Sequence, residues 1–233
     1  MEKQTKYAVF YYEKQDEDLI DELASALEEK AQDIFAFFEI IPTKKAQIRI
    51  IPTKQQYDDI YRKERNLNQD YPLPLWAIGN CREGVITYLS LHDYKSTSHK
   101  YKDADYELAL DYYKKTIVHE YVHFVNENFN EIKQCAYTEK YLVEGIATYL
   151  SGQKTGQEII FDYTIEQILA RDIQKSCYDG WFLVTKYFVE NYAKDFILEI
   201  FQSSRQAREL LTNELYEKAK QHYINCEKES NSK

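Results

Sequence analysis

The sequence predicts an α+β protein with a small α/β half at the N-terminus and a mostly helical half at the C-terminus. The clearest strand-like runs lie before residue 92, where β-branched and aromatic residues gather. All four prolines lie before residue 75, and residues 75–233 contain none. This favours helices there, because proline interrupts them. Six glycines and four prolines in 233 residues disfavour an all-β protein rich in tight turns.

Three strands are expected in the first half. Residues 6–12 (KYAVFYY) and 84–91 (GVITYLSL) are rich in the residue types that strands prefer. Residues 46–51 (AQIRII) alternate between apolar and polar side chains, which is typical of a strand with one buried face.

Helices are expected between these strands. Residues 16–39 place leucines and other apolar side chains at helical spacing, with acidic residues in the first turn. A shorter helix follows Pro52, where Thr53 and Gln56 fit a capping box. The polar stretch 92–103 is predicted to be a loop, and it divides the chain into expected subdomains 1–103 and 104–233.

The second half is predicted to consist of helices. A long one covers about residues 105–128 and a second covers about 138–150, ending near Gly152. A third begins at Thr164, which forms a capping box with Gln167. Further helices are expected over the remaining apolar segments, at about 178–192 and within 194–225.

Charge and composition exclude several functional classes. The net charge of −9 and the pI of about 5.2 disfavour general binding to nucleic acid or to anionic membranes. The chain has no run of 18 apolar residues and no signal-peptide pattern at its start, so we expect a cytosolic protein. The four cysteines contain no CxxC pair and are expected to be free thiols.

The candidate chemistry lies in His119-Glu120-Tyr121-Val122-His123, an HExxH motif inside the long predicted helix. A helix places residues i and i+4 on one face, so both imidazoles can reach one metal ion. Glu120 follows the first histidine, where it can accept a proton from a water molecule that the metal activates. The alternative is that two histidines simply lie on a buried stripe of an ordinary helix.

A third metal ligand is available at Glu144, in the segment YLVEGIATY. A carboxylate within such an apolar helix is costly unless it is paired or bound to a metal. Gly145 follows directly and is expected to allow close packing of one helix on another, since glycine otherwise weakens a helix. A catalytic zinc ion needs three protein ligands and one open position, which this set provides.

These two motifs resemble those of the gluzincin metallopeptidases, in particular the peptidase-MA-like members, whose pattern is HExxH followed by E-G-x-A-x-Y on a second helix. The resemblance implies a zincin-like fold and a Zn²⁺ ion held by His119, His123 and Glu144. It also implies that Glu120 is the general base. The protein would then be a zinc-dependent metallopeptidase, with a peptide or protein as its substrate.

The resemblance extends to both sides of the motifs. Residues 84–91 are similar to the family's edge strand, which pairs with an extended substrate. The segment that begins at Tyr178 resembles one whose leading tyrosine hydrogen-bonds the oxyanion in related aminopeptidases, so Tyr178 is the candidate oxyanion donor. Tyr137, Tyr141 and Tyr149 compete for that role, and the alternative is that Tyr178 is purely structural.

A second class of function stays open at this point. The chain can be a non-catalytic or regulatory protein that retains a zinc-stabilised peptidase fold. The remaining histidines do not point to further chemistry: His92 and His99 are expected in the polar loop, and His222, near the end of the last helix, is expected to be structural.

Overall fold

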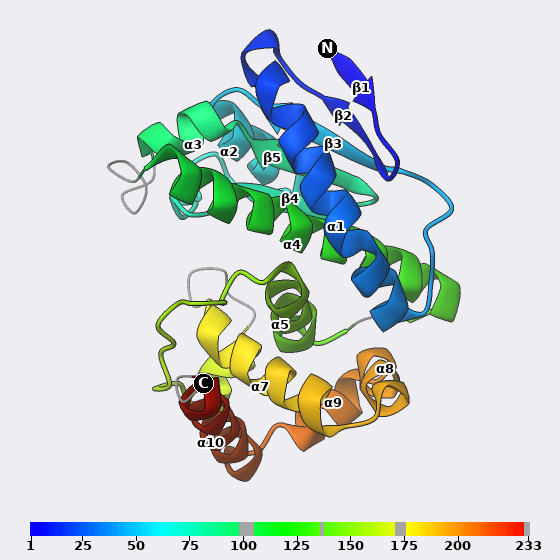
Figure 1. Cartoon of the computed structure of the whole chain (residues 1–233), viewed down its shortest axis with the longest axis vertical. Helices are drawn as coiled ribbons and strands as arrows, with labels where there is room; N and C mark the ends of the chain where they lie inside the picture. Colours follow the sequence, from blue (N-terminus) through cyan, green and yellow to red (C-terminus); the bar gives the residue numbers. More distant parts are fainter. Residues whose placement is uncertain (98–104, 136–137, 171–175, 231–233) are drawn as a thin grey trace. The chain divides into compact units, whose positions relative to one another are not determined.

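The computed structural model describes residues 1–97, 105–135, 138–170 and 176–230. The chain forms two compact units, Met1–Asn128 and Phe129–Lys233 (Figure 1). The α+β class is confirmed, because the first unit contains a five-stranded sheet and the strands of the described chain all lie in it. The division expected after residue 103 lies outside the described residues.

The sheet of the first unit has the order β1-β2-β3-β5-β4. Its strands, in chain order, are β1 (Glu2–Gln4), β2 (Ala8–Tyr11), β3 (Ala46–Ile51), β4 (Gly79–Arg82) and β5 (Val85–Leu89). The three predicted strands are β2, β3 and β5, and they run parallel to one another. Sequence analysis missed β1 and β4, which pair antiparallel at the two edges.

The expected edge strand at 84–91 is wrong. Strand β5 lies inside the sheet, between β3 and β4, and β4 is the edge strand on that side. The reason is a tight hairpin: Glu83 and Gly84 both have positive φ angles, 52° and 78°. Two such residues form the type of turn that joins adjacent antiparallel strands, so the chain before Glu83 folds back along β5.

The helices of the first unit largely follow the apolar periodicity. They comprise the 3₁₀ helix η1 (Lys14–Leu19), α1 (Ile20–Phe38), α2 (Lys54–Glu64), α3 (Leu91–Thr97) and α4 (Tyr106–Lys133). The Thr53 hydroxyl caps α2 by accepting a hydrogen bond of 3.3 Å from the Gln56 amide. The predicted loop at 92–103 is wrong for its first residues, because Leu91 and Tyr94 are both buried and a helical turn lets them share a face.

Helix α4 lies along β5, and both belong to the first unit up to Asn128. The Tyr113 hydroxyl donates to the Leu89 carbonyl, and the Tyr88 hydroxyl donates to the Tyr113 carbonyl, each at 2.6 Å. Fourteen residues further along α4, the Glu127 carboxylate accepts a hydrogen bond of 2.9 Å from the Gly84 amide, before the start of β5. The helix therefore runs in the opposite direction to β5, which brings its middle turns beside the β4–β5 hairpin.

The secondary structure of the second unit, over its described residues, consists of helices joined by turns and loops. It contains the last turn of α4, then α5 (Lys140–Ser151), α6 (Ile165–Ile168), α7 (Tyr178–Asn191), α8 (Lys194–Gln202), α9 (Ser204–Leu210) and α10 (Asn213–Ser230). Both predicted signals at helix ends are confirmed. Thr164 and Gln167 form the capping box of α6, and Gly152 ends α5 in the left-handed conformation.

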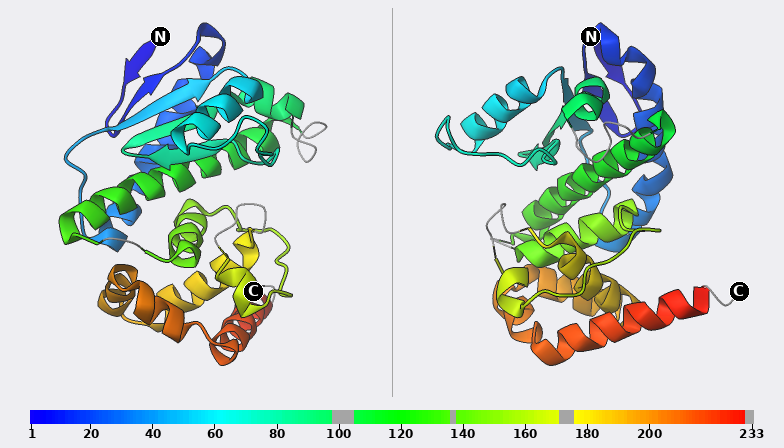
Figure 2. Two further views of the ribbon diagram at one scale, coloured as in Figure 1. Left: turned by 180° about the vertical axis from the view of Figure 1, so that it is seen from behind. Right: turned by 90° about the vertical axis from the view of Figure 1, so that its left-hand side faces the viewer.

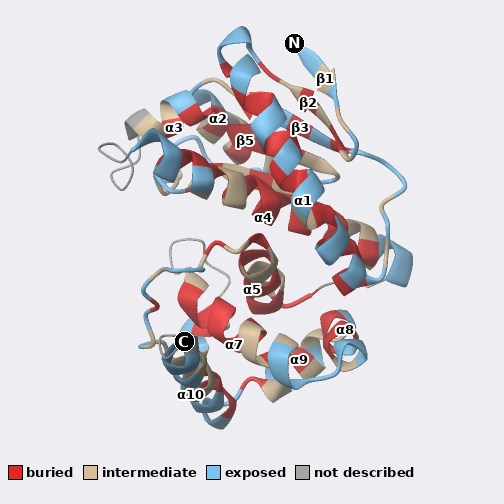
Figure 3. Ribbon diagram, viewed as in Figure 1, coloured by how far each residue is buried: buried red, intermediate tan, exposed pale blue. Residues whose placement is uncertain are grey.

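Helix α7 packs against both α5 and α10 (Figure 2). Its N-terminal half is buried, as the red ribbon in Figure 3 shows. A Cβ atom added at Gly145 would lie 2.6 Å from the Trp181 carbonyl oxygen and would also overlap the Thr185 side chain. The expected close approach of two helices at Gly145 is thus confirmed.

No helix in the described ranges is long and apolar enough to cross a membrane.

Candidate metal centre

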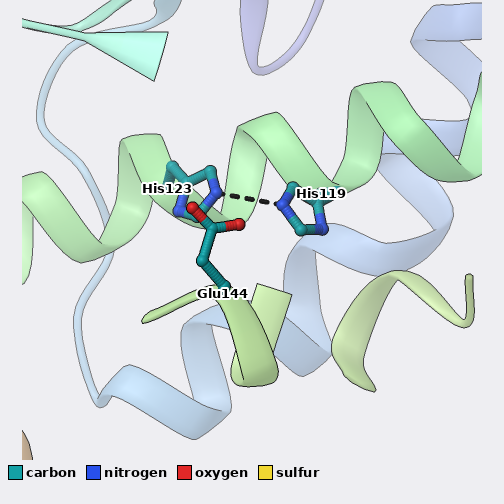
Figure 4. Close-up of side chains that lie close together, drawn as sticks. All are labelled: His119, His123 and Glu144. Carbon is teal, nitrogen blue, oxygen red and sulfur yellow. Dashed lines mark hydrogen bonds between the residues drawn. The ribbon is translucent and has the colours of Figure 1, made fainter. Parts of the chain in front are cut away.

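His119 and His123 lie one turn apart on the same face of α4, within the first unit (Figure 4). Their Nε2 atoms are 3.0 Å apart and their rings meet edge to face, with centroids separated by 4.7 Å. His119 is 4% exposed, and His123 is half-buried. The sequence prediction that these two side chains share one helix face is therefore confirmed.

The helix that carries them is held in place by its apolar neighbours. Val118, Val122 and Val125 are all buried. The ring of Tyr121 lies 6.4 Å from that of Phe35 on α1, centroid to centroid. With one face of α4 fixed by this packing, the directions of the two imidazoles are fixed as well.

The spacing of the imidazoles suits a zinc ion. Zinc–nitrogen bonds of about 2.0–2.1 Å in a tetrahedral site place two ligand nitrogens about 3.3 Å apart. The observed 3.0 Å separation of the two Nε2 atoms requires only a small side-chain adjustment to reach that value. The donor set and its geometry therefore fit a zinc ion.

Glu120 is 6% exposed and lies against the start of the edge strand β4. A Cβ atom added at Gly79 would lie 2.6 Å from Oε1 of Glu120, 2.7 Å from its Cγ and 2.8 Å from its Cδ. Real Cβ atoms do not approach other atoms this closely, so residue 79 must be glycine for Glu120 to keep this position. Sequence analysis missed Gly79, because only the pairing of β4 with β5 brings it beside α4.

Three ionisable groups that feel the charge of Glu120 are themselves uncharged near neutral pH. Burial, with a smaller contribution from Glu120, holds the pKa values of Tyr57 and Tyr88 well above the usual range for tyrosine. Burial, followed by Glu127 and Glu120, likewise raises the pKa of the Cys81 thiol. None of these three groups neutralises the Glu120 carboxylate.

Glu144 lies in α5 of the second unit and is half-buried. The Thr148 hydroxyl donates a hydrogen bond of 2.7 Å to the Glu144 carbonyl oxygen, one turn away. The two histidines belong to the first unit and Glu144 to the second, so the role of Glu144 as the third metal ligand stays a prediction.

Tyr178 is the first residue of α7 and is half-buried. Its ring meets that of Trp181 edge to face, with the centroids 5.0 Å apart. Of its competitors, Tyr141 donates its hydroxyl to the Ala207 carbonyl at 2.7 Å, which gives it a structural role. Tyr149 is half-buried, and Tyr137 lies outside the described residues. The role of Tyr178 as an oxyanion donor stays a prediction.

The remaining candidates have local roles or lie outside the described residues. The four cysteines form no disulfide, as expected. His92 lies in α3, where its Nε2 is 2.9 Å from the Gln15 carbonyl oxygen. His99 lies outside the described residues.

Comparison of the chain with family models, with characterised proteins and with solved structures finds no match.

Proposed function

We propose that the protein is a zinc-dependent metallopeptidase of gluzincin type, in which His119, His123 and Glu144 hold the metal ion. The observation that carries the proposal is the pair of imidazole nitrogens 3.0 Å apart on one face of α4. The glutamate of the same motif lies on the next residue and is itself buried. Two neutral imidazoles and a carboxylate are a donor set that catalytic zinc ions use.

A zinc ion in this position supplies Lewis-acid chemistry: it polarises a substrate carbonyl and lowers the pKa of water toward neutrality. Glu120 accepts the proton from the attacking water and then delivers it to the leaving amine. Its carboxylate has the space for this task because Gly79 carries no side chain where β4 meets it, and the nearby Tyr57, Cys81 and Tyr88 are neutral. Tyr178 is the proposed hydrogen-bond donor to the oxyanion.

The edge strand β4 (Gly79–Arg82) replaces residues 84–91 as the proposed substrate-aligning strand. One side of β4 pairs with β5, and no strand pairs with its other side among the described residues. An extended peptide can add to such an edge through main-chain hydrogen bonds. Because Gly79 contacts Glu120, a peptide bound along β4 would pass close to the proposed general base.

The proposal is tested by incubating the purified protein with a mixed peptide library and identifying the products by mass spectrometry. We expect cleavage that a chelator abolishes and added zinc restores. Glu120→Gln should keep the zinc and lose hydrolysis, because the amide cannot accept the proton. A Glu120→Gln variant that retains both zinc and full activity would refute the mechanism.

The same experiment distinguishes a peptidase from the alternative, a non-catalytic or regulatory protein. Zinc bound by His119, His123 and Glu144 in a protein that cleaves no peptide and no protein substrate would indicate a non-catalytic or regulatory protein instead.

A further inference from the structure

A second group of possible metal ligands lies inside the second unit, on α7 and α10. It consists of Glu190, His222 and Cys226, whose ligand atoms all lie within 4.8 Å of one another. Oε2 of Glu190 is 2.6 Å from Nε2 of His222, and Sγ of Cys226 is 3.7 Å from the same nitrogen. One imidazole nitrogen thus lies close to both a carboxylate oxygen and a thiol sulfur.

The fold explains why these three side chains meet. His222 and Cys226 are four residues apart on α10 and therefore share one face. Glu190 lies in the last turn of α7, which packs against α10. The ring of Tyr187 meets that of His222 edge to face at 5.6 Å between centroids, which orients the imidazole toward Glu190.

The distances suit a zinc ion. Around tetrahedral zinc, a histidine nitrogen and a cysteine sulfur lie about 3.6 Å apart, and a nitrogen and a carboxylate oxygen lie about 3.4 Å apart. The Cys226–His222 spacing of 3.7 Å already matches. The Glu190–His222 spacing of 2.6 Å is shorter than this and has to lengthen when the ion binds. Both side chains reach the surface, with exposed fractions of 28% and 25%.

The type of donor selects the metal. A thiolate, an imidazole and a carboxylate together favour Zn²⁺ over Mg²⁺ or Ca²⁺, which prefer oxygen ligands alone. Lys186 pairs with Oε1 of Glu190, so Oε2 is the oxygen that faces His222. The ion pair with Lys186 therefore holds the carboxylate in place without occupying the oxygen that a metal would use.

We propose that Glu190, His222 and Cys226 form a second zinc site, separate from the proposed catalytic one, that links α10 to α7. His222 is then a metal ligand, in place of the structural role that its position in the sequence indicates. Three protein ligands leave the fourth position to water. Binding at this site stabilises the second unit, since an ion that binds only the folded state lowers its free energy by RT ln(1 + c/Kd), where c is the free zinc concentration.

The test uses Co²⁺ as a spectroscopic probe in the full-length protein carrying His119→Ala, which removes one ligand of the proposed catalytic site. We expect a near-ultraviolet thiolate-to-cobalt band that saturates at one equivalent and disappears when Zn²⁺ is added. At zinc concentrations about 100-fold above Kd, we expect the Tm to rise by about 5–10 °C.

Three variants on this background complete the test. Cys226→Ser should lose the band and bind the metal at least about tenfold more weakly. His222→Ala should lose it as well, whereas the matched control Cys135→Ser, also in the second unit, should keep it. Zinc should also slow alkylation of Cys226 in the unsubstituted protein. This measurement needs no variant and so does not depend on whether one folds.

Absence of a thiolate band, or a band that survives Cys226→Ser, would overturn the proposal. The proposed catalytic ligands include no thiol, so this readout does not depend on whether the protein hydrolyses peptides.

Discussion

Gly79→Ala is expected to impair the proposed general base without removing the metal. The added Cβ would lie 2.6–2.8 Å from three atoms of Glu120, whereas an ordinary contact is about 3.4–4 Å. The Glu120 side chain must therefore move by about 1 Å. Misplacing a catalytic group by about 1 Å can cost about 100-fold in rate, so we expect kcat to fall by about two orders of magnitude.

The assay compares kcat, KM, zinc content and Tm of the variant with those of the unsubstituted protein, using a peptide that the latter cleaves. Most of the loss should appear in kcat, because the proton transfer is disturbed. Zinc content should not change, since the three atoms nearest to the added Cβ belong to Glu120, which is not a proposed metal ligand. The free energy of unfolding should fall by about 1–3 kcal/mol, the usual cost of overpacking.

Gly156→Ala is the matched control. Gly156 has a φ angle of 72°, so alanine is strained there, but an added Cβ has no neighbour within 4 Å. The control should lose about 1 kcal/mol of stability and keep its activity. If Gly79→Ala keeps the kcat of the unsubstituted protein, or loses no more activity than Gly156→Ala, then Gly79 does not position Glu120.

Two further predictions concern the second unit. Gly145→Ala should lower the free energy of unfolding, measured by urea denaturation, by about 2–3 kcal/mol. The reason is that the new methyl group would overlap the Trp181 carbonyl and the Thr185 side chain. A change below about 0.5 kcal/mol would contradict the packing of α5 on α7. Burial raises the pKa of the Cys177 thiol to about 11. At pH 8.5 we therefore expect iodoacetamide to modify Cys177 about 100-fold more slowly in the native protein than in urea, and equal rates would refute its burial.

Some strands of the sheet can be predicted from the sequence and others cannot, for physical reasons. Strands β2 and β5 consist mostly of β-branched and aromatic residues, so their composition identifies them, and β3 is identified by its alternation of apolar and polar residues. Strand β4 has the sequence Gly-Asn-Cys-Arg, which carries no strand-like periodicity. It becomes a strand because the turn at Glu83 and Gly84 folds it against β5. The sequence therefore predicts β5 as the edge of the sheet, whereas the edge strand is β4.

The contacts of the candidate site also differ in how far the sequence predicts them. The HExxH spacing is local, so the sequence alone predicts that His119 and His123 share a helix face. The contact of Gly79 with Glu120, and that of Glu190 with His222, join residues 41 and 32 positions apart in the sequence. Such contacts depend on how helices and strands pack against one another, and no local sequence pattern predicts them.

The most direct test of the central proposal is an anomalous difference map, collected at the zinc absorption edge from crystals grown with zinc. We expect a peak bonded to Nε2 of His119, to Nε2 of His123 and to the carboxylate of Glu144. Crystals that contain zinc but show no peak at these three side chains would contradict the proposed catalytic centre.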